Sequence, residues 1–275
     1  MGALRSRLTR SVRTGLALAD QWGFIHRFVY DENLRRIGKV LRWEHRRRPP
    51  LQGIIAKVRT DDASLRFFVE NDFDVVQSHH RAGTLFEAEE LAVLARYYRG
   101  GTFVDVGGNV GNHAVWAARI LRAPRVIVFE PDPHSARICE INLQLNGCGG
   151  VAELRRKGLS ATAGGAAIDE LVGDNLGGTR LREAAGGPMT LTRGDDELRS
   201  ERVGVLKIDT EGFEMKVLEG LREIIARDRP TLYVEVENEN LAAFDRFCAR
   251  AGYRVAERFQ PYPQVVDMIA VPNQA

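Results

Sequence analysis

The sequence predicts an α/β protein in which helices cover both faces of a mainly parallel, doubly wound sheet. Two patterns indicate this fold class. From residue 102 onward, short and mainly apolar strand patterns alternate with helix patterns. Strands of that kind are typical of a parallel sheet buried on both faces, and right-handed crossovers make it doubly wound. A chain of 275 residues with 44% hydrophobic and 28% charged residues can supply the core.

Residues 1–50 form a separate basic arm. They hold 12 Lys/Arg against 4 Asp/Glu, a net charge of +8, whereas the remainder has a net charge of −6. We expect either a helix packed on the main domain or a surface for an anionic partner or lipid headgroups. Because the positive charge is confined to the arm, we expect no nucleic-acid ligand.

The expected location is the cytoplasm. The apolar stretch 16–19 is too short for a secretory signal, and no apolar run approaches the roughly 18 residues of a membrane span. The chain has three cysteines, Cys139, Cys148 and Cys248, which give neither a disulfide framework nor a metal-ligand spacing. We therefore expect reduced thiols.

A domain is expected over 51–275, and it begins with a hairpin. The β-rich segments 54–59 and 65–70 flank a turn. Thr84 and Glu87 form a capping-box pattern, which predicts a helix over about 85–98.

A strand–helix–strand unit follows the first helix. Segment 102–106 predicts a strand, 112–121 a helix and 125–130 a second strand. Asp132-Pro133 combines a preferred N-cap residue with proline at the first helical position, so we expect a helix that runs to about Asn146.

The second half of the domain continues the alternation after an interruption. A third strand is expected near 151–158, and the Gly-, Asp-, Arg- and Thr-rich segment 164–200 is expected to have little regular structure. Segment 203–209 predicts a buried strand, and the apolar spacing in 214–227 predicts a helix. The remaining expected elements are a strand at 231–236, a helix at 240–251 and strands at 253–258 and 265–271.

The first strand ends in a glycine-rich loop, and such sheets bind ligands at the carboxyl ends of their strands. Gly107 and Gly111 allow a tight turn, but Asn109 and Asn112 stand where a dinucleotide fingerprint needs glycine. Asp105, within the strand end, repels a pyrophosphate and pairs well with a cationic amino-acid group. S-adenosylmethionine has an ammonium group, a sulfonium and no phosphate, so the loop favours it over NAD.

The second strand ends at Glu130, 23 residues after Gly107. A carboxylate there can accept both hydrogen bonds of a ribose diol. This placement supports an adenosine nucleoside without choosing between cofactors. The alternative is a carboxylate that caps the following helix.

The strand at 203–209 leads into the acidic segment LKIDTEGFE. Lys207 and Asp209 share one strand face. Asp209 and Glu211 are expected where a substrate would meet the transferable methyl group. Alternatively, Glu211 and Glu214 merely favour the positive end of the next helix.

Five segments together resemble the FkbM-type S-adenosylmethionine-dependent methyltransferases: FVDVGGNVG, VIVFEPDP, INLQLNG, LKIDTEGFEMKVLEG and RPTLYVEVE. DNLGGTRL and DDEL also match, and the resemblance covers about 84–258. It implies a Rossmann-like, seven-stranded class I methyltransferase sheet, ordered 3-2-1-4-5-7-6 with strand 7 antiparallel. It also implies an enzyme that O-methylates a hydroxyl of a natural product or of a sugar or glycan.

The resemblance and the strand ends together give a set of candidate site residues. The candidate cofactor contacts are Asp105, Gly107, Gly108, Asn109, Gly111, Asn112, Glu130, Pro131 and Ser160. The candidate substrate loop comprises Asn175, Gly177, Gly178 and Thr179. The candidate catalytic residues are Asp209 as orienting group or base, Glu211, Lys207 and His113.

Three further interpretations concern metals and other function classes. The acidic run 195–197 is expected to be solvated, and we predict no metal site. A nicotinamide-dependent oxidoreductase is an alternative that the failed glycine pattern disfavours. A non-catalytic binding protein is a second alternative, but a scaffold has no need of both Asp105 and Glu130.

Overall fold

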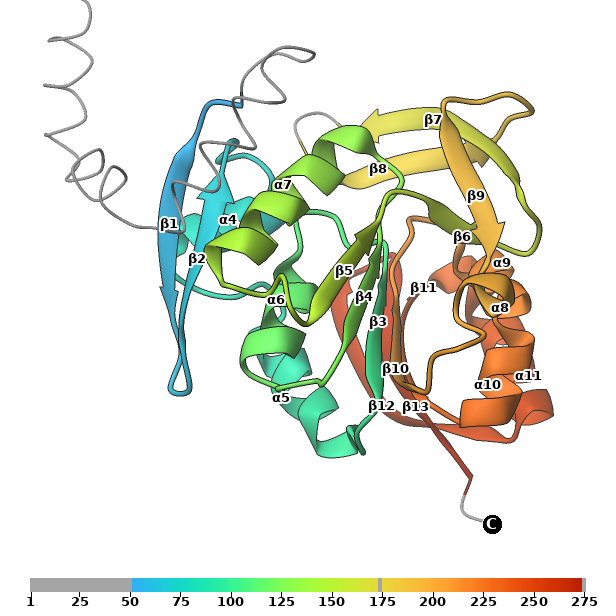
Figure 1. The fold of residues 1–275 in the computed structure, drawn as a ribbon. Coiled ribbons are helices and arrows are strands. Elements are labelled where there is room, and N and C mark those ends of the chain that lie inside the picture. The colour runs from blue at the N-terminus through green and yellow to red at the C-terminus, as the bar shows by residue number, and fades with distance from the viewer. Residues whose placement is uncertain (1–50, 173–174, 274–275) are drawn as a thin grey trace, which may run out of the picture.

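The computed structural model describes residues 51–172 and 175–273, so the basic arm 1–50 lies outside the described residues. A seven-stranded sheet forms the centre of the molecule (Figure 1). Its strands in spatial order are β5 (Ala152–Arg155), β4 (Val126–Phe129), β3 (Thr102–Val106), β10 (Val203–Ile208), β11 (Thr231–Glu237), β13 (Val265–Pro272) and β12 (Tyr253–Tyr262). Strand β13 runs antiparallel to both of its neighbours, β11 and β12, and every other pair of neighbouring strands in this sheet is parallel. Both the predicted strand order and the antiparallel strand 7 are confirmed.

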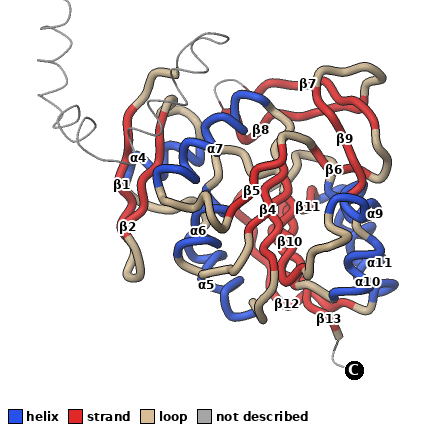
Figure 2. Tube along the Cα trace, in the orientation of Figure 1, coloured by secondary structure: helices blue, strands red, loops and turns tan. Residues whose placement is uncertain are grey.

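Helices cover both faces of this sheet, as predicted (Figures 1 and 2). One face packs against α5 (Ala88–Tyr97), α6 (Asn112–Arg119) and α7 (Pro133–Leu145). The other face packs against α9 (Glu214–Gly220), α10 (Arg222–Asp228) and α11 (Leu241–Ala251), which follows the short 3₁₀-helix η1 (Asn238–Asn240). None of the helices in the described residues has the length and apolar character that crossing a bilayer requires.

The predicted hairpin is present as β1 (Ile54–Arg59) and β2 (Ser64–Val69), which pair antiparallel. Helix α7 holds it in place through two amide side chains. Asn142 Oδ1 accepts from Phe68 N at 2.6 Å, and Asn146 both accepts from Arg66 N and donates to Arg66 O. Asp132 caps α7 by accepting from the N–H groups of residues 134 and 135, as its position before Pro133 predicted.

The capping-box prediction at Thr84 is wrong. Helix α5 begins at Ala88, and Glu87 precedes it with a left-handed φ of 55° and no side-chain cap. Thr84 Oγ1 instead donates to His79 O. An unpredicted helix, α4 (Val75–Ala82), lies just before this segment, and Asp74 caps it by accepting from Gln77 N at 2.8 Å.

The prediction of little regular structure over 164–200 is also wrong. This segment supplies most of a second sheet in the order β6 (Gly158–Ser160), β9 (Met189–Arg193), β7 (Gly164–Val172) and β8 (Asn175–Glu183), and it ends with the short helix α8 (Gly194–Glu197). Strands β7 and β8 form an antiparallel hairpin. The buried side chains Leu159, Ala166 and Leu191 join this small sheet to the main core.

The helix predicted over 214–227 is divided into α9 and α10 after Gly220. A Cβ atom at Gly220 would lie 2.1 Å from Ser160 O, so glycine is needed where the helix meets β6.

Candidate active site

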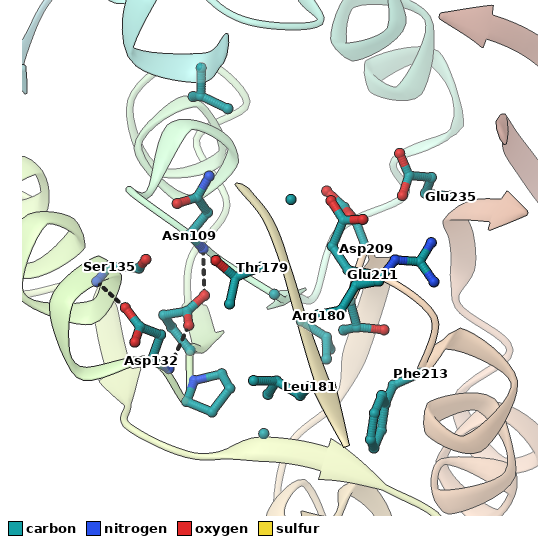
Figure 3. A pocket seen from close by; sticks show the side chains of 18 of the residues that line it. Asn109, Asp132, Ser135, Thr179, Arg180, Leu181, Asp209, Glu211, Phe213 and Glu235 are labelled. Atoms are coloured by element: carbon teal, nitrogen blue, oxygen red, sulfur yellow. Dashed lines mark hydrogen bonds between the residues drawn. The ribbon is translucent and has the colours of Figure 1, made fainter. Parts of the chain in front are cut away.

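A cavity of about 460 Å³ opens at the carboxyl ends of β3, β4, β10 and β11, where the sheet topology predicted a site. Strand β8 of the small sheet contributes Gly178, Thr179, Arg180 and Leu181 to its wall. Figure 3 shows two sides of the cavity: Asn109, Asp132 and Ser135 lie on one, and Asp209, Glu211 and Glu235 lie on the other.

The glycine loop after β3 forms the first side. Gly107 has φ 79°, and a Cβ atom there would lie 1.7 Å from Asp209 O, so the loops after β3 and β10 touch through their backbones. Asn109 also has a left-handed backbone, with φ 45°. Its N–H donates to Glu130 Oε2 at 2.8 Å, and its buried Oδ1 has no hydrogen-bond partner among the described residues.

Glu130 lies at the end of β4 and is 7% exposed. Its Oε1 accepts from Asp132 N at 2.8 Å, so both carboxylate oxygens already hold one backbone N–H. Burial raises the pKa of Glu130 to about 7, although these N–H groups act in the opposite direction. Each oxygen keeps a further acceptor position for a hydroxyl.

Lys207 lies beneath the cavity and is 3% exposed. Its Nζ donates to Gly107 O at 3.0 Å and to Asp209 Oδ2 at 3.2 Å, and it lies 3.4 Å from Asp105 Oδ1. Burial alone would lower the pKa of Lys207, but the charges of Asp209, Asp105 and Glu87 raise it above its ordinary value. Lys207 therefore connects the glycine loop to the acidic side.

Glu87 receives two side-chain contacts at the start of α5. Its Oε2 accepts from Tyr233 Oη at 2.7 Å and lies 2.9 Å from His113 Nε2. Burial would raise the pKa of Glu87, but the neighbouring His113 and these hydrogen bonds lower it. Glu87 lines the cavity while His113 lies behind it, so the structure places His113 as a partner of Glu87.

The second side of the cavity is an acidic cluster formed by Asp209, Glu211 and Glu235. One carboxylate oxygen from each residue lies within 4.8 Å of the other two. Burial, together with repulsion from neighbouring carboxylates, raises the pKa values of both Glu211 and Glu235. Glu211 also has a left-handed φ of 53°.

The structure places the candidate residues in two layers. The cavity lining contains Gly107, Asn109, Glu130, Pro131, Gly178, Thr179, Asp209 and Glu211. Outside that lining lie Asp105, Gly108, Gly111, Asn112, His113, Ser160 and Lys207. Asn175 and Gly177 both lie in β8, and the Asn175 side chain lies outside the described residues.

Several residues of the second layer have structural partners. Asn112 Oδ1 lies 2.9 Å from His80 Nε2, and Asn112 Nδ2 donates to Phe86 O. Ser160 Oγ donates to Glu183 Oε1 at 3.0 Å. Asp105 is fully buried beneath the loop, so its charge acts on the site through Lys207.

Four polar residues of the cavity lining were not predicted from the sequence: Glu87, Arg180, Glu235 and Tyr262. Glu235 could have been predicted, because it lies near the end of the expected strand in YVEVE. Glu87 was assigned another role, since its spacing from Thr84 matches a capping box.

Comparison with known proteins gives a family match. Residues 105–255, more than half of the chain, match the family model described as the methyltransferase FkbM domain. No curated protein matches the sequence.

Solved structures of methyltransferases resemble this chain. Methyltransferase FkbM from Methylobacillus flagellatus is 16% identical with a TM-score of 0.48, and the match covers 70% of this chain and 52% of that chain. This chain thus spans about half the length of that protein. A ribosomal protein methylase from Lactobacillus delbrueckii is 14% identical (TM-score 0.46, covering 80% and 100%). An rRNA methylase from Streptococcus thermophilus is 12% identical (TM-score 0.42, covering 68% and 95%).

Proposed function

The chain belongs to the FkbM family of S-adenosylmethionine-dependent methyltransferases, and from this premise we propose that it methylates a hydroxyl group of a natural product or of a sugar or glycan. The observation that carries the proposal is the two-sided cavity. One side combines the glycine loop with Glu130, and the other presents Asp209 and Glu211. Family membership displaces the oxidoreductase and the non-catalytic scaffold as explanations of this site.

The cofactor side fits S-adenosylmethionine in two respects. The unpartnered, buried Asn109 Oδ1 offers an acceptor to a donor such as the cofactor's ammonium. Glu130 has the spare acceptor capacity that a ribose diol needs.

The acceptor side fits the deprotonation of a hydroxyl. S-adenosylmethionine supplies an activated methyl group on a sulfonium leaving group. The protein then has to hold the acceptor oxygen about 3 Å from the methyl carbon and take up its proton. Asp209 is the first candidate for this task, because Lys207 fixes its Oδ2 at 3.2 Å while the side chain keeps 30% exposure to the cavity. Glu211 is the second candidate.

Calorimetric titration with S-adenosylhomocysteine tests the cofactor half of the proposal. We expect micromolar binding by the wild type and at least tenfold weaker binding by Glu130→Gln, because a hydrogen bond to a charged group contributes roughly 1.5–3 kcal/mol. The matched control is Glu219→Gln, an exposed carboxylate outside the cavity. Absence of binding to folded wild-type protein would contradict the proposal.

The affinity for S-adenosylhomocysteine should also depend on pH. Since burial raises the pKa of Glu130 to about 7, this side chain becomes a full carboxylate only as pH rises from about 6 to 8. We expect the wild-type affinity for S-adenosylhomocysteine to increase over this interval and the Glu130→Gln affinity to change less. Parallel pH profiles in the two proteins would show that Glu130 does not contact the ligand.

Incubation with ¹³C-methyl-labelled S-adenosylmethionine and a panel of hydroxylated sugars and polyketides tests the acceptor class. NMR of the labelled product distinguishes O-methyl from N-methyl and C-methyl groups. A labelled O-methyl product supports the proposal, whereas a product labelled only on nitrogen or carbon contradicts the assignment to hydroxyls.

A further inference from the structure

The acidic cluster of Asp209, Glu211 and Glu235 has more negative charge than its surroundings balance. Among the described residues, neither the Glu211 carboxylate nor the Glu235 carboxylate has a hydrogen-bond or ion-pair partner. Two basic side chains act on the cluster, but both have other partners. Lys207 pairs with Asp209 and Asp105, and Arg180 pairs with Glu237.

A fourth carboxylate lies next to the cluster in the sheet. Asp267 of β13 is directly opposite Glu235 of β11 in the antiparallel register, so the two side chains lie on the same sheet face. Asp267 is 3% exposed, and its buried Oδ2 has no hydrogen-bond partner among the described residues. The pairing of Ile208 with Val234 and of Val234 with Met268 places Asp209 in the same row. Thus Asp267 adds an unpaired, buried carboxylate to this side of the cavity.

The loop that carries Glu211 is also held by a carboxylate. Glu214 is 2% exposed, and its Oε1 accepts from Thr210 N, Thr210 Oγ1 and Gly212 N at 2.9–3.0 Å. Its other oxygen, Oε2, is buried without a partner among the described residues. These contacts fix the backbone on both sides of Glu211 and direct its carboxylate toward Asp209, as Figure 3 shows.

Half-buried and buried carboxylates in such numbers must be either protonated or balanced by a positively charged ligand, because an unpaired buried charge is strongly destabilising. The geometry favours a metal ion. Hard divalent cations bind carboxylate oxygens at about 2.0–2.6 Å, so oxygens on one ion lie roughly 3–5 Å apart. The oxygens of Asp209, Glu211 and Glu235 already have this spacing, within 4.8 Å of one another.

We propose that Asp209, Glu211 and Glu235 bind a hard divalent cation, Mg²⁺ or Mn²⁺, at the acceptor side of the cavity. The three carboxylates supply three ligands, and the cavity leaves the remaining positions open to water or to oxygens of the acceptor. This proposal departs from the sequence-based expectation that no metal is bound. That expectation rested on the cysteine spacing and on the acidic run 195–197, and it did not bring in Glu235, which is distant from Asp209 and Glu211 in the sequence.

The role of the cation in catalysis rests on the proposed methyl transfer. An acceptor hydroxyl bound to the cation would have a lowered pKa, so its proton could leave to water, and Asp209 would then act as a ligand instead of as the base. The oxygen lone pair then forms the C–O bond as the S–C bond breaks, and the electron pair of that bond stays on sulfur. A sugar or polyketide with two adjacent oxygens suits such a site, since both can bind one ion.

Titration of the metal-free, full-length protein with MnCl₂ tests the cation site directly, with free Mn²⁺ measured by electron paramagnetic resonance. We expect one Mn²⁺ per chain with a Kd below about 1 mM, displaced by Mg²⁺. Glu211→Gln and Glu235→Gln should each weaken binding at least tenfold. Asp196→Asn serves as the matched control, since Asp196 lies in another acidic run and is paired with Arg199.

Thermal melting followed by circular dichroism shows whether the variants fold. Metal-free Glu235→Gln should melt no lower than the metal-free wild type, because the substitution removes a charge from a crowded group of carboxylates. Mn²⁺ should raise the melting temperature of the wild type but not of this variant. Absence of Mn²⁺ binding to folded wild-type protein, or equal binding by wild type and both Gln variants, would overturn the site.

Titration of the same samples with S-adenosylhomocysteine separates this inference from the proposed function. Binding of S-adenosylhomocysteine without binding of Mn²⁺ overturns the cation site and leaves the methyltransferase assignment intact. The acidic cluster would then be free for a cationic acceptor. Mn²⁺ binding without S-adenosylhomocysteine binding overturns the proposed function and keeps the cation site.

Discussion

At the scale of single residues, the site depends on the close approach of two loops. Gly107 lies against the backbone of Asp209, Asp209 N donates to Val106 O at 3.1 Å, and Lys207 binds Gly107 O. The left-handed φ of 79° and the absent Cβ at Gly107 are therefore both needed. No other residue type meets both conditions.

A comparison of Gly107→Ala with Gly147→Ala should distinguish the cost of the left-handed φ from the cost of the steric clash of a Cβ atom. Gly147 has φ 67°, but no atom lies within 4 Å of the point that a Cβ would occupy, so its replacement should cost only the backbone term of roughly 1–2 kcal/mol. Gly107→Ala should reduce the free energy of unfolding by clearly more, since the new Cβ would lie 1.7 Å from Asp209 O. Urea unfolding measures both values, and equal costs would contradict the close approach.

The sequence predicted those site residues whose chemistry is tied to a strand end. Glu130 and Asp209 directly follow apolar strands, so their position could be inferred from local pattern alone. The role of Glu235 in the site could not be predicted in this way, because it depends on the pairing of β11 with β10, which brings Glu235 close to Asp209. The spacing of Thr84 and Glu87 predicted a helix cap, but tertiary contacts with Tyr233 and His113 use the Glu87 carboxylate instead.

At the scale of secondary-structure elements, α4 is a short helix held by one buried histidine. The His80 ring stacks on Phe67 with centroids 3.7 Å apart, and its Nε2 lies 2.9 Å from Asn112 Oδ1. Burial lowers the pKa of His80 to about 4. The helix thus joins the hairpin to the first turn of α6 through a neutral imidazole.

The buried His80 predicts a loss of stability in mild acid. Its folded pKa of about 4 lies below the ordinary 6.5, so the unfolded chain binds the proton first as pH falls. Between pH 7.5 and 5 this should lower the wild-type free energy of unfolding by about 2 kcal/mol relative to His80→Gln, at about 1.4 kcal/mol per pH unit below 6.5. Urea unfolding at both pH values measures the difference, and His79→Gln on the same helix should behave like the wild type.

Elements with strong local patterns were predicted well, and those that depend on distant contacts were not. The N-cap at Asp132 and the strands of the main sheet agree with the sequence. The small sheet escaped prediction because its strands are rich in polar residues and glycine, and its pairing of β6 with β9 joins segments about 30 residues apart. The break at Gly220 likewise depends on a contact with Ser160.

At the scale of the whole molecule, the described lining of the cavity lies in the domain that follows the basic arm. Its lining residues extend from Val75 to Val265 and come from both sheets. The proposed domain boundary near residue 50 is consistent with this distribution. Residues 1–50 lie outside the described residues, and for them the sequence predicts either a helix packed on the main domain or a surface for an anionic partner or lipid headgroups.

A truncated chain of residues 51–275 should keep the affinity of the full-length protein for S-adenosylhomocysteine within about twofold. The physical reason is that the truncated chain keeps every lining residue among those that the structure describes. Calorimetric titration of both proteins measures this, and circular dichroism confirms that the shorter one folds. Sedimentation with anionic vesicles tests the lipid alternative for the arm, and there only the full-length chain should pellet. In the calorimetric titration, a large loss of ligand affinity on truncation would refute the domain boundary.

The hairpin of β7 and β8 has a consequence for how this enzyme can diversify. Its strands pair with each other and with β9, so no hydrogen bond of the seven-stranded sheet passes through them. Yet β8 supplies a wall of the cavity opposite the strand ends. Mutations in β8 can therefore change the shape of this wall while the seven-stranded sheet and the proposed cofactor contact of Glu130 stay unchanged. Natural variation in acceptor choice, and laboratory evolution toward new acceptors, should therefore accumulate in this hairpin first.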